Sequence, residues 1–244
     1  MKKLALILCI LMLILSSCGD VSETTGNAAT SQVTTTQKTE QKAPQKVEVP
    51  YERAQAIKLS EVDFTAFGDR YDTKEGFSLE KFLPVLKNEA KFKWQNGEAL
   101  EVTMSEFHKA LWGDNESLSD ELMVYGFIVK NIDGVDDAEV VLDLADLAGT
   151  YLVLTVGEDG IYGKEFPIRI FNLLESGLYQ SSSSAGSGSY NMLMFDDGEF
   201  IEHKVATYDG DKYTLKGDDV TKEDFDAFFA KFDMNPVNYI DVAK

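Results

Sequence analysis

Alternation of apolar and polar residues dominates the chain after residue 122 and predicts β-strands. Turn-forming stretches, such as Asp133-Gly134 and the run GEDG at 157–160, separate the apolar-rich segments. Alternation with a period of two buries one face of a strand, and strands at this spacing favour a β-sandwich. The predicted strands are MVYGFIV (123–129), AEVVLDL (138–144), YLVLTV (151–156) and IYGKEFPIRIF (161–171).

The last part of the chain, residues 173–244, predicts a small antiparallel β-meander followed by a helix. Strand-like segments end at Asp-Gly turns, and Thr221 is placed to cap a helix whose first turn is acidic. Four aromatic residues then recur at helical spacing and indicate a buried stripe. They are Phe225, Phe228, Phe229 and Phe232. The run SSSSAGSGS (181–189) has low complexity and predicts a flexible loop.

Residues 51–104 form a mixed segment that ends in a predicted hairpin. The stretch SLEKFLPVLKNEA (78–90) has helical spacing, but Pro84 predicts a kink within it. The stretch KFKWQNGEALEV (91–102) alternates on both sides of an Asn-Gly pair, which is a strong hairpin signal. A capping-box pattern, Thr103 with Glu106, predicts a short helix directly after it.

Three short motifs lie close together in the middle of the chain: VKNIDGV (129–135), LADLAGTYLVLTV (144–156) and EDG (158–160). Together they resemble the bacterial immunoglobulin-like domains of surface proteins, which implies an immunoglobulin-like β-sandwich over residues 105–172. The first aspartate of that family's turn is Asn131 here. Gly149 suits a tight corner into a strand, and Tyr151 suits a buried ring beside that corner. A plain antiparallel meander is the alternative.

The chain begins with Lys2 and Lys3 and an apolar run at residues 4–15. About a dozen apolar residues are fewer than the ~20 that a membrane-spanning helix needs, so residues 1–17 are typical of a secretory signal peptide. The sequence Leu15-Ser16-Ser17-Cys18 resembles the lipobox of bacterial lipoproteins. That family is cut before the cysteine, which carries a diacylglyceryl group. The resemblance implies a protein anchored through Cys18 on the extracytoplasmic face of the cell membrane; the alternative is an ordinary secreted protein.

Residues 18–50 predict a disordered tether that follows the lipidated cysteine. This segment is rich in Thr, Gln, Ser and Lys, and it contains no aromatic residue. Such a composition buries too little apolar surface to offset the entropy lost on folding. We therefore expect the folded part to begin near residue 51.

Cysteine usage and charge exclude several classes of function. Cys9 lies in the signal peptide and Cys18 would carry lipid, so no thiol remains for a disulfide, a zinc–thiolate site or an iron–sulfur cluster. Removal of Lys2 and Lys3 leaves 21 basic against 42 acidic residues, a net charge of −21. This excess repels phosphate backbones and argues against a nucleic-acid partner.

Candidate chemistry is sparse, and no cofactor is expected. His108 and His203 are the two histidines of the chain, and no nucleophile elbow, zinc motif or phosphate-binding loop accompanies them. Calcium is the one ion that the acidic turns could suit, since it prefers oxygen ligands, although neither turn has EF-hand spacing. The candidate calcium ligands are Asp133, Asp136, Asp137, Asp209 and Asp211.

The sequence therefore favours a lipid-anchored protein of the cell envelope without catalytic residues. We expect a non-enzymatic binding, adhesion or envelope-associated module with an unknown protein or glycan ligand. A surface hydrolase that acts on glycans or peptides is the alternative, because the spacing of acidic residues along the chain says nothing about their separation in space.

Overall fold

The structure is a computed structural model that describes residues 55–67, 79–113, 121–134, 138–145 and 149–243. All of them belong to the unit Pro50–Lys244. The predictions of a signal peptide, of lipidation at Cys18 and of a tether concern residues 1–50, which lie outside the described residues.

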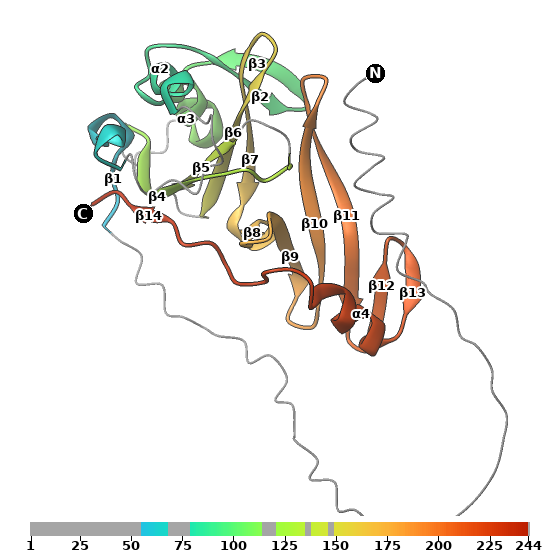
Figure 1. The fold of residues 1–244 in the computed structure, drawn as a ribbon. Coiled ribbons are helices and arrows are strands. Elements are labelled where there is room, and N and C mark those ends of the chain that lie inside the picture. The colour runs from blue at the N-terminus through green and yellow to red at the C-terminus, as the bar shows by residue number, and fades with distance from the viewer. Residues whose placement is uncertain (1–54, 68–78, 114–120, 135–137, 146–148, 244) are drawn as a thin grey trace, which may run out of the picture. The chain divides into compact units, whose positions relative to one another are not determined.

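One sheet has eight strands and contains both the predicted hairpin and the central strands (Figure 1). Its order is β1-β4-β5-β6-β7-β2-β3, and β14 also pairs with β4. All pairs are antiparallel except β2 with β7, where Lys93 lies beside Tyr162. The strands are β1 (Ile57–Lys58), β2 (Phe92–Asn96), β3 (Glu98–Val102), β4 (Met123–Lys130), β5 (Glu139–Leu144), β6 (Thr150–Gly157), β7 (Gly160–Pro167) and β14 (Ile240–Asp241).

The second sheet is an antiparallel meander of six strands in sequence order. Its two longest strands, β10 and β11, form a ribbon that extends from the β2–β3 hairpin to α4 (Figure 1). The strands are β8 (Asn172–Leu173), β9 (Leu178–Ser184), β10 (Ser187–Asp196), β11 (Glu199–Asp209), β12 (Lys212–Leu215) and β13 (Asp218–Val220).

The helices are short, and their ends follow local sequence signals. In α3 the side chain of Thr103 accepts from the backbone N–H of Glu106, and the Glu106 side chain accepts from the N–H of Thr103, which confirms the predicted capping box. Thr221 caps α4 as predicted. The helices are α2 (Leu83–Leu86), α3 (Met104–Trp112) and α4 (Lys222–Phe229), with 3-10 turns η1 (Leu59–Glu61), η2 (Phe64–Phe67), η3 (Leu79–Lys81) and η4 (Ile168–Ile170).

Two sequence predictions need correction. The helical pattern at 78–90 breaks into η3 and the single turn α2, because Pro84 fits only the first positions of a helix. The serine-rich run at 181–189 is ordered and forms the tips of β9 and β10. Pairing of β10 with both neighbours satisfies backbone groups that a flexible loop would expose to water.

Three apolar clusters hold the structure together. The first lies between one face of the eight-stranded sheet and the N-terminal helices, where Phe107 is fully buried. The second joins the other face, through Val141 and Val153, to Tyr179 and Leu193 of the second sheet. The third lies between α4 and the far half of the second sheet. The eight-stranded sheet is therefore covered on both faces.

The predicted fold class, mainly β with a meander and a C-terminal helix, is confirmed. The two layers that face each other come from opposite sides of the expected domain boundary at residue 172. The strands β4 to β7, which precede it, are consecutive neighbours in one sheet, and β9 to β11, which follow it, belong to the other sheet. Within residues 105–172, β4 to β7 thus form the middle of one layer, which β1, β2, β3 and β14 extend, and β9 to β11 supply the facing side chains. Gly149 has a φ of +71°, in agreement with the predicted corner, whereas the ring of Tyr151, predicted to be buried, is only partly buried and stacks on Tyr239 at 5.3 Å.

Candidate functional site

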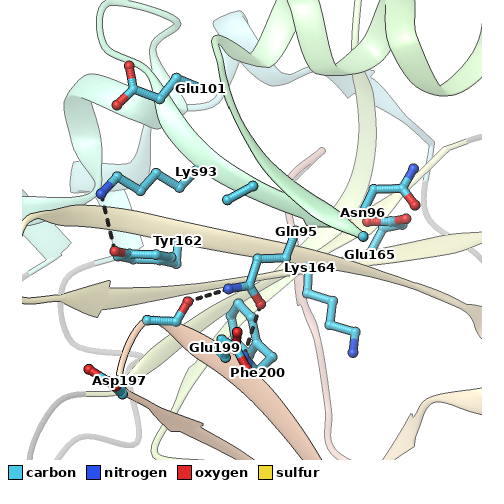
Figure 2. A pocket seen from close by; sticks show the side chains of 13 residues that line it. Lys93, Gln95, Asn96, Glu101, Tyr162, Lys164, Glu165, Asp197, Glu199 and Phe200 are labelled. Carbon is cyan, nitrogen blue, oxygen red and sulfur yellow. Dashed lines mark hydrogen bonds between the residues drawn. The ribbon is translucent and has the colours of Figure 1, made fainter.

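A groove of about 710 Å³ lies where the β2–β3 hairpin and β7 meet the turn between β10 and β11 (Figure 2). Most of its lining side chains are polar or charged. In Figure 2, Lys93 and Glu101 lie on one side of the groove, Asp197 and Glu199 lie on the other, and Tyr162 lies between them. The groove thus joins parts of the chain that are about a hundred residues apart in sequence.

Strand alternation explains why these side chains share one face. Lys93 is directly opposite Glu101 in the β2–β3 pair, and it also lies beside Tyr162 in the parallel β2–β7 pair. Phe92 and Trp94, the two neighbours of Lys93 on β2, point to the opposite face, where both are buried in the first apolar cluster. The same alternation therefore anchors the strand on one side and lines the groove on the other.

Gln95 fixes the β10–β11 turn against the hairpin. Its Nε2 donates to the carbonyl of Gly198, and its Oε1 accepts from the N–H of Phe200 at 2.9 Å. The turn requires left-handed backbone at Asp197 (φ +50°) and Gly198 (φ +81°), as the Asp-Asp-Gly sequence favours. One amide side chain therefore satisfies two backbone groups of the other sheet and sets the groove wall.

Lys93 is held by two groups beside the groove. Its Nζ forms an ion pair with Asp159 and donates to the hydroxyl of Tyr162 at 3.2 Å. The Tyr162 hydroxyl itself donates to Asp159 at 2.6 Å. The hydrogen bond with Asp159 is the main reason that the pKa of Lys93 is raised, and the same bond lowers the pKa of Asp159. Lys93 therefore stays protonated and is already paired.

Lys164 is paired in the same way. Its Nζ donates to Glu202 Oε1 at 2.9 Å, and the Tyr179 hydroxyl donates to Glu202 Oε2 at 2.6 Å. Burial opposes ionisation of Glu202, but these two hydrogen bonds outweigh it and lower the pKa of Glu202. Burial and the bond to Glu202 raise the pKa of Tyr179. The carboxylate therefore stays charged and neutralises Lys164.

The carboxylates of the groove are not balanced in this way. Four carboxylates line the groove, compared with two lysines. One of the four, that of Glu165, accepts a hydrogen bond from the indole N–H of Trp94. The side chains of Glu101, Asp197 and Glu199 form no hydrogen bond or ion pair with any described residue. The groove therefore carries an excess of negative charge.

The residues that the sequence singled out lie elsewhere. Asp133 is in the β4–β5 connection of one sheet, whereas Asp209 and Asp211 are exposed at the β11–β12 turn of the other. Asp136 and Asp137 lie outside the described residues. Within the described ranges, no group of three or more His, Cys, Asp or Glu is arranged to hold a metal ion.

The two histidines are likewise apart from the groove. His108 lies on α3 with its ring 5.0 Å from that of Trp112, and His203 is exposed on β11. Sequence reasoning missed the groove residues because β2, β7 and β11 are distant in the chain. The Asn-Gly and Asp-Gly turns were the local signals that pointed to its rims.

Comparisons with protein-family models, with curated proteins and with solved structures give no match to this chain. Among the described residues, no helix is both long and apolar enough to cross a membrane. The function is therefore inferred from the chemistry of the sequence and of the groove.

Proposed function

We propose that the protein is a lipid-anchored extracytoplasmic lipoprotein whose folded unit is a non-enzymatic binding module. The anchor rests on the signal-peptide pattern and on the lipobox ending at Cys18. Two acyl chains hold a protein stably at a membrane, whereas a single myristoyl-sized chain holds it only marginally. The ligand site would then face the outside of the cell.

The groove beside Gln95 is the observation that carries the binding function. Its walls come from two sheets and are joined by both polar atoms of one side chain. A wall fixed before the ligand arrives costs little ordering entropy on binding. Concave sites with a few positioned polar groups are the usual places for ligands.

Metabolic labelling tests the anchor. Cells that express the chain are fed radiolabelled palmitate, and we expect label on the wild-type protein and none on Cys18→Ser. The wild type should also sediment with membranes, while the variant is released. Equal labelling of both proteins, or a wild-type chain that keeps Met1, would contradict the anchor.

Groove blocking tests the binding function. Ala99 lines the groove, whereas Leu100 next to it is 48 % exposed on the other face of β3. The full chain, purified in detergent, is screened by thermal shift against chito-oligosaccharides, cello-oligosaccharides and synthetic peptides. We expect Ala99→Trp to abolish the stabilisation that a hit produces and Leu100→Trp to retain it. A flat screen, or equal shifts in both variants, would argue against the groove as a binding site.

A surface hydrolase of glycans or peptides remains the second candidate, because four carboxylates line one groove. Glycoside hydrolysis uses two carboxyl groups roughly 5–10 Å apart. If the groove is catalytic, chito-oligosaccharide or casein turnover should fall on the order of 100-fold or more in Glu101→Gln or Glu199→Gln. Binding without turnover would favour the non-enzymatic module.

A further inference from the structure

We infer that the groove, together with the outer edge of β3, binds an extended basic peptide segment of a partner protein. The inference rests on the proposed binding function and adds the chemical class of the ligand. Three arguments support it. The charge of the groove is uncompensated, the groove lies at the end of a sheet, and β3 of a second copy of this chain would be repelled because it is also acidic.

Charge is the first argument. The lysines of the groove are neutralised by carboxylates, Lys93 by Asp159 and Lys164 by Glu202. Glu101, Asp197 and Glu199 are without an ion pair in the described part of the chain. A ligand with two or more positive charges can therefore pair with carboxylates on both sides of the groove without breaking an existing ion pair.

The second argument comes from the sheet edge. β3 is the last strand in the order of the eight-stranded sheet, so no described strand pairs with its outer side. An unpaired strand edge is a template for an extended peptide, which gains affinity from main-chain hydrogen bonds and specificity from alternate side chains. Glu101 and Ala99 are two residues apart on β3, and both line the groove. Alternate side chains of the added strand would reach the same face.

Charge also decides between occupants of this edge. β3 itself carries Glu98 and Glu101, and the whole chain is strongly acidic. A second copy would bring an identical acidic edge alongside, and like charges directly opposite each other on paired strands are destabilising. A lysine or arginine of an incoming strand would instead lie opposite Glu101, and the basic side chains at alternate positions would share the groove face with it. The complementarity therefore favours a basic segment of another protein.

Titration with synthetic peptides tests the inference on the full chain in detergent. The probe is a short peptide that alternates lysine and threonine, and its partner peptide has glutamine in place of lysine. We expect the lysine peptide to bind, with an affinity that falls as salt rises, and the glutamine peptide to bind much more weakly. The double variant Glu101→Gln/Glu199→Gln should bind the lysine peptide on the order of tenfold more weakly.

A matched control has the same change in charge away from the groove. Glu61 and Glu89 are exposed, and their side chains form no hydrogen bond or ion pair with the described residues, so Glu61→Gln/Glu89→Gln should bind like the wild type. Thermal melting of both double variants should match the wild type, which separates loss of binding from loss of folding. Equal weakening in the two double variants would overturn the inference, because it would indicate attraction to net charge alone.

Two further outcomes separate this inference from the proposed function. If an oligosaccharide binds in the groove, with the effect of Ala99→Trp described above, and the lysine peptide does not bind, the binding function stands and the basic-peptide inference fails. If backbone N-methylation of the lysine peptide leaves its affinity unchanged, or spermine binds as tightly, pairing with the edge of β3 is overturned. If neither glycan nor peptide binds, both proposals fail.

Discussion

Glu139 is a carboxyl group placed where water cannot reach it. Its side chain is 3 % exposed at the start of β5, and it accepts from the N–H of Ile132 at 2.7 Å and from Thr155 Oγ1 at 3.2 Å. Burial, and then the charge of Asp133, raise the pKa of Glu139 to about 8. The folded protein therefore holds a proton at this site that the unfolded chain releases near pH 4.5.

The stability of the protein should depend on pH through this group. Because the folded state binds the extra proton, the stabilising contribution of Glu139 to the unfolding free energy is fully present below pH 4.5. It is lost as pH rises through about 8. Between these values one proton changes the unfolding free energy by up to about 1.4 kcal/mol per pH unit.

We expect Glu139→Gln, which imitates the protonated form, to flatten that part of the profile and to exceed the wild type in stability above pH 8. Urea unfolding measured from pH 5 to pH 9 checks this. Parallel profiles for the two proteins would contradict the assignment.

At the scale of elements, α4 shows how an aromatic stripe is divided between core and rim. Phe229 is 8 % exposed and its ring lies 4.5 Å from that of Tyr190, whereas Phe228 and Phe232 are only partly buried. The helical spacing of the four phenylalanines predicts the stripe, but the spacing alone does not say which of them is most deeply buried. The burial of each ring depends on how closely it packs against the side chains of β10 and β12.

We therefore expect Phe229→Ala to cost about 3 kcal/mol of unfolding free energy and Phe228→Ala about half as much. The larger loss follows from the larger cavity left at the more buried site. Chemical unfolding of the two variants, followed by circular dichroism, measures the difference. Equal losses would mean that α4 shifts and fills the space.

Local signals predicted several other elements, and they failed where a neighbour strand decided the outcome. The capping box of α3 and the hairpin at Asn96-Gly97 follow from residues a few positions apart. The serine-rich run was expected to be flexible because composition alone does not show a sheet beside it. Gly188 explains its close packing, since a Cβ there would meet the carbonyl oxygen of Ser181 at 2.4 Å.

At the scale of the whole molecule, Gln95 is a polar connection between the two sheets. Without its amide, the carbonyl of Gly198 and the N–H of Phe200 would lose partners in a part-buried place. A backbone group left unsatisfied in this way costs about 1–3 kcal/mol.

We expect Gln95→Ala to lower the unfolding free energy by about that amount and to abolish ligand binding in the groove. Gln95→Glu keeps an acceptor for Phe200 and should lose less stability. Urea unfolding and peptide titration of both variants provide the two readouts. Unchanged stability in Gln95→Ala would show that water replaces the amide.

The sequence by itself determined the mainly β class, the hairpin and turn positions, the caps of α3 and α4, and the acidic character of the chain. These features depend on residues within one or two turns of each other, where backbone preference and side-chain period act directly. The tertiary structure alone decided the parallel pairing of β2 with β7 and the groove closed by Gln95. It also decided that the strands before and after residue 172 form two layers that face each other. Such contacts depend on which surfaces, distant in the chain, can be buried together with their hydrogen bonds satisfied. Contacts of this kind leave no repeating pattern of residues in the sequence from which they could be predicted.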